Sequence, residues 1–267
     1  MPRPVRVTYS VLPTPAAVAE AAARLFASRV IAAVKARGVA RVAISGGSTP
    51  KTMFQMLADP AKPYLTEVPW DGLQLFWVDE RCVPPDHADS NFRMTREAML
   101  DHVPLAAERI HRMEGELEPA VAAARYESTI RNVFKLEGAE TPTFDLVLLG
   151  MGDDGHTASL FPHTEALNEM ALIVTANPVP QKDTWRITLT WPVINQARQV
   201  AFLIEGEAKA DVLHDVLLGP YDPETRPSQL IRPASGELLF LLDKDAAAKL
   251  PEPAEEADVP TGTLELR

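Results

Sequence analysis

One histidine of this sequence stands directly after a turn rich in glycine and aspartate. Residues 150–155 read Gly-Met-Gly-Asp-Asp-Gly, and His156 follows them. The apolar run 146–149 precedes the turn, as is typical of a buried parallel strand. Imidazole changes its charge near neutral pH, so a histidine beyond a strand end, two residues after the Asp154 carboxylate, is suited to proton transfer. We take His156 as a candidate catalytic residue, with a buried structural histidine as the alternative.

A second turn, at residues 45–50, has the composition of a phosphate-binding loop. Gly46 and Gly47 let main-chain N–H groups face an anion, and Ser48 and Thr49 add hydroxyl donors. Pro50 opens a helix whose N-terminus favours negative charge. The alternative is a tight strand-to-helix turn in which Ser or Thr is the N-cap. A nucleotide is not favoured, because the chain lacks both the Walker lysine pattern and G-x-G-x-x-G.

Charged residues follow two further predicted strands. Asp79, Glu80 and Arg81 come directly after the strand 73–78, where Arg81 could clamp an anion or form part of a salt-bridged rim. Lys209 lies in the charged segment after the strand 199–204 and is a candidate anchor for an anion, with a solvated lysine as the alternative. Arg186, on an alternating strand, could point into the same cleft or into solvent.

Neither a metal site nor a disulfide framework is predicted. Asp153, Asp154 and His156 would suggest metal ligands, but no second cluster supplies the missing ones. Cys82 is the single cysteine, which excludes an internal disulfide and fits a reducing compartment. Because no dedicated base stands near it in sequence, we expect a partly buried thiol and not a nucleophile.

Composition places the chain among soluble, acidic proteins. It has 267 residues, 46% hydrophobic content and a net charge of −11, which opposes bulk binding of nucleic acid or an anionic membrane. A small anionic ligand is not excluded, because local arginines and helix N-termini decide its binding. The start of the chain lacks the apolar segment of a signal peptide, and charges interrupt the apolar stretch 16–36. We therefore expect a cytoplasmic location and no membrane partner.

Strands and helices alternate along the chain, which predicts one doubly wound α/β domain with a mostly parallel sheet over residues 1–250. The segment 168–191 is the least regular and is expected to hold a small lid or subdomain. Residues 251–267 are rich in Glu and Pro and are expected to form a loosely attached tail. The predicted strands lie at 5–9 (a candidate for a sheet edge), 39–44, 73–78, 144–149, 172–175, 185–190, 199–204 and 238–242. If the sheet is parallel, the ends of four strands meet on one rim and form a single active site.

Taken together, these residues resemble the 6-phosphogluconolactonase family. The matching segments occur in family order, from about residue 5 to residue 242, and the histidine segment is the most specific. They are residues 45–50 (SGGSTP), 79–81 (DER) with 90–91 (SN), 150–162 (GMGDDGHTASLFP) and 186–190 (RITLT). The resemblance implies a modified Rossmann-like fold of the sugar-phosphate isomerase type. It also implies a metal-independent enzyme without a cofactor, which hydrolyses 6-phospho-D-glucono-1,5-lactone in the oxidative pentose phosphate pathway.

The chain departs from the family pattern at one position. Relatives often carry a lysine beside prolines before the Arg186 strand, where this chain has Val179. Lys182 is the candidate replacement. The related glucosamine-6-phosphate deaminases share the fold, but their histidine segment continues into an asparagine–glutamate pair that is absent here.

The resemblance leads to a mechanistic hypothesis. His156 would remove a proton from the water that attacks C1 of the lactone, and Asp154 would orient the imidazole. The phosphate and sugar would be held by the remaining site candidates, which are Gly46, Gly47, Ser48, Thr49, Asp79, Arg81, Arg186 and Lys209. One alternative is a sugar-phosphate isomerase or deaminase that uses Asp79 or Glu80 at C2, and another is a non-catalytic sugar-phosphate sensor. The sequence does not distinguish a monomer from a weak dimer.

Overall fold

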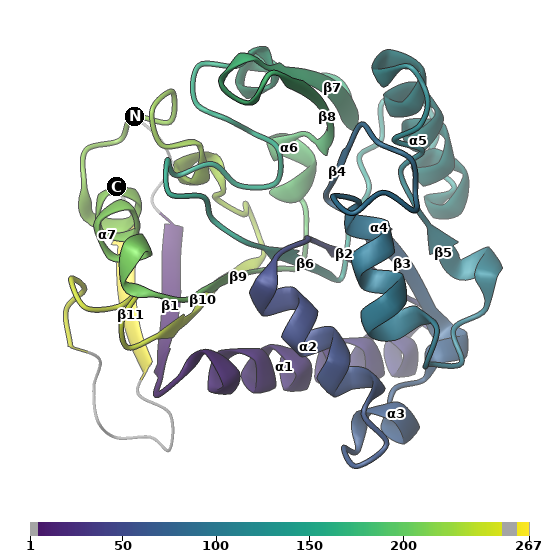
Figure 1. Ribbon diagram of the computed structural model, residues 1–267, viewed down its shortest axis with the longest axis horizontal. Helices are drawn as coiled ribbons and strands as arrows, with labels where there is room; N and C mark the ends of the chain where they lie inside the picture. Colours follow the sequence, from purple (N-terminus) through teal and green to yellow (C-terminus); the bar gives the residue numbers. More distant parts are fainter. Residues whose placement is uncertain (1–4, 253–260, 267) are drawn as a thin grey trace.

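The computed structural model describes residues 5–252 and 261–266 and contains a central, mostly parallel sheet (Figure 1). Its strand order is β11-β1-β10-β9-β6-β2-β3-β5, and every neighbouring pair is parallel except β11 and β1. The strands of this sheet are β1 (Val5–Leu12), β2 (Ala40–Ile44), β3 (Leu73–Trp77), β5 (Ile110–His111), β6 (Leu146–Leu149), β9 (Gln199–Ile204), β10 (Glu237–Asp243) and β11 (Thr261–Leu266). The predicted α/β class is confirmed.

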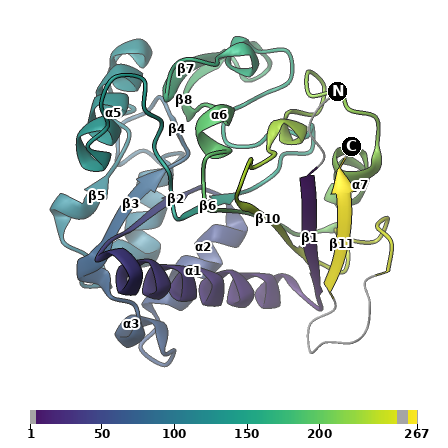
Figure 2. The same ribbon diagram turned by 180° about the vertical axis from the view of Figure 1, so that it is seen from behind.

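Helices cover both faces of the sheet (Figures 1 and 2). The α-helices are α1 (Pro15–Arg37), α2 (Ser48–Ala58), α3 (Tyr64–Glu67), α4 (Asn91–Thr95), α5 (Pro119–Phe134), α6 (Trp191–Ile194) and α7 (Ala210–Leu218). The shorter turns are η1 (Trp70–Gly72), the π-helical η2 (Arg96–Leu100), η3 (Ala107–Arg109), η4 (Glu165–Asn168), η5 (Pro180–Lys182), η6 (Glu207–Lys209) and η7 (Pro227–Leu230). Within the described ranges, no helix is long and apolar enough to cross a membrane.

Each central strand is apolar on both sides, which is why it reads as a continuous hydrophobic run. On β2, Val42 and Ile44 pack in the core formed with α1, α2 and α3, while Ala43 faces the core formed with α5, α6 and α7. Helix α1 begins where Thr14 caps its first turn and ends at Gly38, whose φ of 75° suits glycine. In Figure 1, α1 runs below the sheet and α6 lies above it.

The connections that leave β2 and β6 run in opposite directions. Strand β2 leads through α2 to β3 on one side, whereas the chain after β6 crosses to β9 on the other side. Since β2 and β6 are neighbours, their carboxyl ends border a topological switch point, where open α/β sheets form their binding crevice. The turn 45–50 and the histidine loop are the two segments that leave these strands.

A second, three-stranded antiparallel sheet stands beside the first. It consists of β4 (Asp79–Arg81), β8 (Thr184–Leu189) and β7 (Val174–Val179), in the order β4-β8-β7. The expected irregular segment 168–191 thus contains a regular hairpin, β7–β8. Strand β4 follows β3 almost directly, so Asp79–Arg81 joins the two sheets.

The sequence misplaced the two ends of the chain. The expected loose tail is wrong for Thr261–Leu266, which forms β11 and pairs with residues 5–10 of β1. Consequently β1 is not an edge strand, because β11 covers its free edge. The segment Thr-Gly-Thr-Leu-Glu-Leu alternates as a strand should, and Gly262 leaves room for the ring of Tyr9. Elsewhere in the expected tail, the structure describes Pro251 and Glu252. The remaining positions, 253–260 and 267, lie outside the described residues.

Candidate active site

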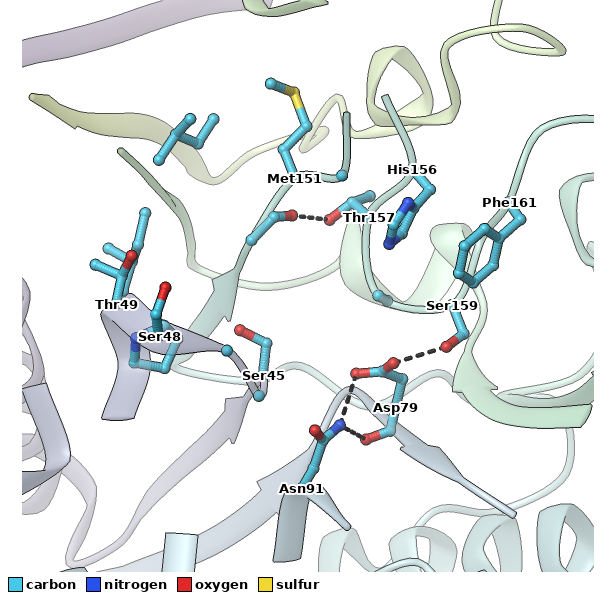
Figure 3. Close-up of a pocket in the computed structure, with 18 of the residues that line it drawn as sticks. Ser45, Ser48, Thr49, Asp79, Asn91, Met151, His156, Thr157, Ser159 and Phe161 are labelled. Atoms are coloured by element: carbon cyan, nitrogen blue, oxygen red, sulfur yellow. Dashed lines mark hydrogen bonds between the residues drawn. The ribbon is translucent and has the colours of Figure 1, made fainter. Parts of the chain in front are cut away.

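The four predicted strand ends meet in one cavity of about 590 Å³ at the carboxyl edge of the sheet. Its wall contains nine of the ten predicted site residues, and the tenth, Asp154, contacts His156. The lining residues that carry the following argument are Ser45, Gly46, Gly47, Ser48, Thr49, Asp79, Arg81, Asn91, Gly152, His156, Ala158, Ser159, Phe161, Lys182, Arg186, Glu205 and Lys209. Figure 3 shows several of them surrounding the cavity. The expected convergence on one rim is therefore present in the structure.

The His156 ring is fixed by contacts on two sides. Its Nδ1 lies 2.6 Å from Oδ1 of Asp154, and its face stacks on Phe161 with ring centroids 4.0 Å apart. The loop closes through a hydrogen bond of 2.8 Å from the N–H of Gly152 to the carbonyl of His156. A Cβ atom at Gly152 would lie 2.0 Å from Nδ1, so this glycine makes room for the imidazole.

The charge of Asp154 determines the tautomer of His156. Burial acts to raise the pKa of Asp154, but the hydrogen bonds from the ring and main chain of His156, together with the imidazole charge, lower it to about 2. An ionised carboxylate only accepts hydrogen bonds, so Nδ1 of the ring carries the proton. In the neutral imidazole the other nitrogen, Nε2, is then a free proton acceptor.

The turn 45–50 leads into α2 without a side-chain cap. Gly47 is the N-cap residue, with a φ of 121°, and within the described ranges no side chain accepts from the first N–H groups of the helix. These N–H groups are orphan donors beside the positive end of an 11-residue helix, which suits an anion. Ser48 donates its hydroxyl to Glu205 at 3.0 Å, and Thr49 is buried.

Of the two adjacent carboxylates, only Asp79 borders the cavity. Its Oδ2 accepts from the Ser159 hydroxyl at 2.7 Å, and its carbonyl accepts from the Asn91 amide at 3.0 Å. Glu80 points the other way and caps the start of α4. Four donors bind it: the main-chain N–H groups of Arg81, Asn91 and Phe92, and the Ser90 hydroxyl. Burial raises the pKa of Glu80, against the opposing effect of its N–H donors.

Two arginines of the cavity wall stand opposite each other. Arg81 on β4 and Arg186 on β8 are directly paired across the antiparallel strands. Burial lowers the pKa of Arg186, and the charge of Arg81 lowers it further. In the described part of the chain, neither guanidinium lies within 4.0 Å of a carboxylate. Like charges opposite each other are unfavourable, so this pair is a ready partner for a bound anion.

The lysines differ in their pairing. Lys209 forms an ion pair with the exposed Asp153 at the rim, so an anion would have to compete with that carboxylate. Lys182, at the end of η5, lines the cavity from the β7–β8 hairpin. Val179, the position at which the family resemblance leads us to expect a lysine, is buried in that hairpin.

Burial raises the pKa of the Cys82 thiol to about 11, despite the nearby charge of Arg186. A thiol with so high a pKa is a poor nucleophile near neutral pH. Residues 5–252 and 261–266 contain no group of three or more His, Cys, Asp and Glu side chains that could hold a metal ion.

Three polar residues of this wall have a role that the sequence did not predict. Asn91 and Ser159 hold Asp79 from two different loops, and Glu205 accepts from Ser48 at the start of α2. Asn91 and Ser159 both belong to the motifs that carry the family resemblance. The family motifs marked the positions of Asn91 and Ser159. They did not predict the contacts of these residues with Asp79, because those contacts join segments far apart in the chain.

Comparison with known proteins identifies the family. The model of the glucosamine-6-phosphate isomerases/6-phosphogluconolactonase family matches residues 13–240. The chain therefore belongs to this family, and the resemblance found in the sequence is confirmed. A 6-phosphogluconolactonase from Nostoc sp. is 43% identical over 248 residues, which cover 92% of this chain and 99% of that protein. One from Synechocystis sp. is 43% identical over 225 residues, which cover 84% and 90% of the two chains.

Solved structures agree with this assignment. The 6-phosphogluconolactonase from Trypanosoma cruzi superposes with a TM-score of 0.79 at 32% identity, covering 91% of this chain and 96% of that one. A monomeric glucosamine-6-phosphate deaminase superposes with a TM-score of 0.75 at 18% identity, covering 90% and 99%. At that identity the deaminase shows the shared fold alone.

Proposed function

We propose that this protein is a 6-phosphogluconolactonase that hydrolyses 6-phospho-D-glucono-1,5-lactone to 6-phosphogluconate. The carrying observation is a carboxylate-oriented imidazole in the same cavity as two opposed arginines that have no carboxylate partner among the described residues. An ester carbonyl needs an activated water, and a phosphorylated substrate needs an anion site. The proteins of Nostoc and Synechocystis to which this chain is similar are both 6-phosphogluconolactonases, and the similarity covers nearly their full length.

His156 acts as the general base in this proposal. Its Nε2 takes a proton from water as the water oxygen attacks C1 of the lactone. Asp154 holds the proton on Nδ1 and stabilises the imidazolium that forms. The tetrahedral intermediate then collapses, the bond from C1 to the ring oxygen breaks, and the imidazolium returns its proton to that oxygen. Main-chain N–H groups of the glycine turns support the transient oxyanion.

The phosphate is held at the start of α2 and by cations of the cavity wall. Gly46, Gly47, Ser48 and Thr49 supply main-chain and hydroxyl donors, and Arg81, Arg186 and Lys209 supply positive charge. Lys182 faces the same cavity and takes the place of the lysine that is absent at Val179. Asp79, held by Ser159 and Asn91, is a hydrogen-bond acceptor for the hydroxyls of the sugar.

The isomerase and deaminase alternative finds less support in these contacts. Glu80 faces away from the cavity and is bound by four donors, and one oxygen of Asp79 is engaged by Ser159. The decisive experiment is an assay with freshly generated 6-phosphogluconolactone, from which spontaneous ring opening is subtracted. Glucosamine 6-phosphate with an ammonia readout is the parallel assay. Ammonia release without lactone hydrolysis would overturn the proposal.

A further inference from the structure

The histidine loop (residues 150–162) is attached to the three-stranded sheet through one residue, Ser159. This serine is 1% exposed and makes one hydrogen bond to each strand. Its hydroxyl donates to Oδ2 of Asp79 on β4 at 2.7 Å, and its main-chain N–H donates to Oγ1 of Thr188 on β8 at 3.2 Å. Its carbonyl accepts from Nδ2 of Asn177 on β7 at 2.8 Å. The loop is therefore fixed to all three strands of that sheet.

Asn177 is also connected to the ring of His156 by a second route. Its Nδ2 donates to Oγ1 of Thr164 at 3.0 Å, and that hydroxyl donates to the carbonyl of Phe161 at 2.8 Å. The ring of Phe161 stacks on His156 with the centroids 4.0 Å apart, and Figure 3 shows the two rings side by side. One amide group thus supports the loop at Ser159 and, through Thr164, at the residue on which the imidazole rests.

The amide of Asn177 is used for its donors. The side chain is 0% exposed, both protons of Nδ2 are engaged, and within the part of the chain that the structure describes Oδ1 has no hydrogen-bond partner. The orientation of the amide is fixed, because the carbonyl of Ser159 can only accept. A buried oxygen without a partner is unfavourable for folding, so stability alone does not explain an asparagine here. The position requires the NH₂ group.

The backbone beside Ser159 is strained and depends on such support. Ala158 has a φ of 47°, in the left-handed region that residues other than glycine adopt at a cost. On its other side, Thr157 donates its hydroxyl to the carbonyl of Gly150 at 2.8 Å. The strained residue therefore lies between one anchor at the end of β6 and another on the three-stranded sheet.

We infer that Asn177 is a positioning residue for His156, which holds the imidazole in place relative to the two arginines of the cavity wall. Asn177 pairs with Arg186 across β7 and β8, and Arg186 pairs with Arg81 across β8 and β4, so the three residues form one row of the sheet. Asn177 does not line the cavity and acts through the loop. This role rests on the proposed function, in which His156 is the base.

Asn177→Asp is compared with Asn195→Asp. The first keeps the size of the side chain but places a carboxylate oxygen against the carbonyl of Ser159. Asn195 is a matched control, because it is 8% exposed, its Nδ2 donates to the carbonyl of Leu230 at 2.8 Å, and it does not line the cavity. Both changes remove a buried donor and cost stability. Asn177→Ala and Asn195→Ala form a second pair that buries no new charge.

Turnover of freshly generated 6-phosphogluconolactone is measured at a temperature at which circular dichroism shows every variant folded. We expect kcat of both Asn177 variants to fall about 10–100-fold, because a small displacement of the base from the attacking water is costly. KM should stay within about threefold, since the groups that hold the phosphate are unchanged. The Asn195 variants should keep wild-type kcat. Unchanged kcat in the Asn177 variants, or an equal fall in the Asn195 variants, would overturn the inference.

A cycle with His156→Ala separates positioning from a general loss of structure. In the His156→Ala background, Asn177→Asp should lower kcat by less than about twofold further, because no base is left to misplace. A loss in the double variant equal to the product of the two single losses would show that Asn177 acts independently of His156. That result would also overturn the inference.

The ring signals of His156 in NMR spectra, assigned by their absence in His156→Ala, give a readout that does not depend on activity. They should shift in both Asn177 variants and stay in place in the Asn195 variants. If they do so while the wild-type protein does not hydrolyse the lactone, Asn177 positions His156 and the lactonase proposal fails. If the wild-type protein hydrolyses the lactone while both Asn177 variants keep the wild-type signals and kcat, the reverse is true.

Discussion

A single oxygen of Asp154 contacts both the ring and the main chain of His156. Oδ1 lies 2.6 Å from Nδ1 and accepts the main-chain N–H of the same residue at 3.0 Å. The carboxylate therefore sets the tautomer of the imidazole and, at the same time, the position of the loop that carries it. Because the pKa of Asp154 is lowered to about 2, the carboxylate stays ionised and accepts both hydrogen bonds across the working pH range.

Replacing Asp154 by Asn keeps the size of the side chain but lets it donate a hydrogen bond to Nδ1. The proton of the neutral imidazole would then move to Nε2, and the base would face the cavity in the wrong tautomer. We expect kcat to fall by about 10²–10⁴-fold, with a small change in KM. The coupled assay, corrected for spontaneous ring opening, measures both constants.

The matched control is Asp101→Asn, since Asp101 is an exposed aspartate whose one ion pair within the described residues is a 3.9 Å contact with Arg96. It should keep wild-type kinetics. Near-wild-type kcat in Asp154→Asn would contradict the role of the carboxylate. An equal loss in His156→Ala is expected, because the two residues act as one unit.

The opposed arginines predict a change that depends on the substrate's phosphate. Replacing Arg81 by Met removes one of two like charges that face each other across β4 and β8. We expect KM for 6-phosphogluconolactone to rise about tenfold or more, since a charge-assisted contact is lost. Thermal stability should stay equal or increase, because the repulsion is relieved. Unphosphorylated glucono-1,5-lactone should be turned over as by wild type.

The exposed Arg6 provides a control for this variant, because Arg6→Met removes the same charge far along the sheet. An equal loss on both lactones in Arg81→Met would place Arg81 at the sugar and not at the phosphate. The double variant with Arg186→Met should lose more than the single variant if both guanidinium groups hold the same phosphate.

The single cysteine should be catalytically silent. Burial raises the pKa of Cys82 to about 11, so almost none of the thiol is ionised at pH 8. We expect Cys82→Ala to keep kcat within about twofold of wild type, and the native thiol to react with iodoacetamide much more slowly than free cysteine. Mass spectrometry follows the labelling. Rapid labelling that abolishes activity would contradict this prediction.

The sequence predicted the parts of the site that local chemistry defines. Gly46 and Gly47 mark the turn before α2, and the glycines at 150, 152 and 155 mark the histidine loop. These signals are readable because each set of glycines determines the backbone conformation of its own segment. Contacts between residues far apart in the chain could not be predicted in this way. The contact between Ser159 and Asp79 joins residues 80 positions apart, and nothing near either residue marks the other. Likewise, only the fold pairs Lys209 with Asp153.

The C-terminal strand shows how far the fold could be predicted from the sequence. Thr261–Leu266 alternates, but a short alternating segment forms a strand only where a free sheet edge accepts it. The sequence predicted residues 5–9 as a candidate edge strand, but it did not show that residues 261–266 would pair with that edge. The Glu- and Pro-rich composition before this segment favours a tail, and the pairing with β1 overrides that preference at residues 261–266.

The strand assignment of residues 261–266 makes a stability prediction. Leu266 is 4% exposed and belongs to the core on the α5, α6 and α7 face. Leu266→Ala should lower the free energy of unfolding by about 2 kcal/mol, through lost burial and a residual cavity. Kinetic constants should not change, because Leu266 does not line the cavity. Urea unfolding measures the effect, and the exposed Thr263→Ala is the control. Equal stability of both variants would argue for a loose tail.

His111 predicts how stability depends on pH. Its ring stacks on Phe76 at 4.6 Å, and Nε2 lies 2.6 Å from Oε1 of Gln74. Burial lowers the pKa of His111 to about 4, whereas an unfolded histidine titrates near 6.5. Between these values the unfolded chain binds a proton that the folded protein does not. The stabilising effect is thus complete above about pH 6.5 and is lost as the pH falls toward 4.

Replacing His111 by Gln removes this titration. Between pH 7 and pH 5, the wild-type free energy of unfolding should fall by roughly 1–2 kcal/mol more than that of His111→Gln. Urea unfolding of both proteins at the two pH values measures the difference. The exposed His87→Gln is the control and should keep the wild-type pH dependence, because its side chain is 48% exposed. If wild type and His111→Gln lose the same stability between pH 7 and pH 5, the half-buried ring does not stay neutral in the folded protein.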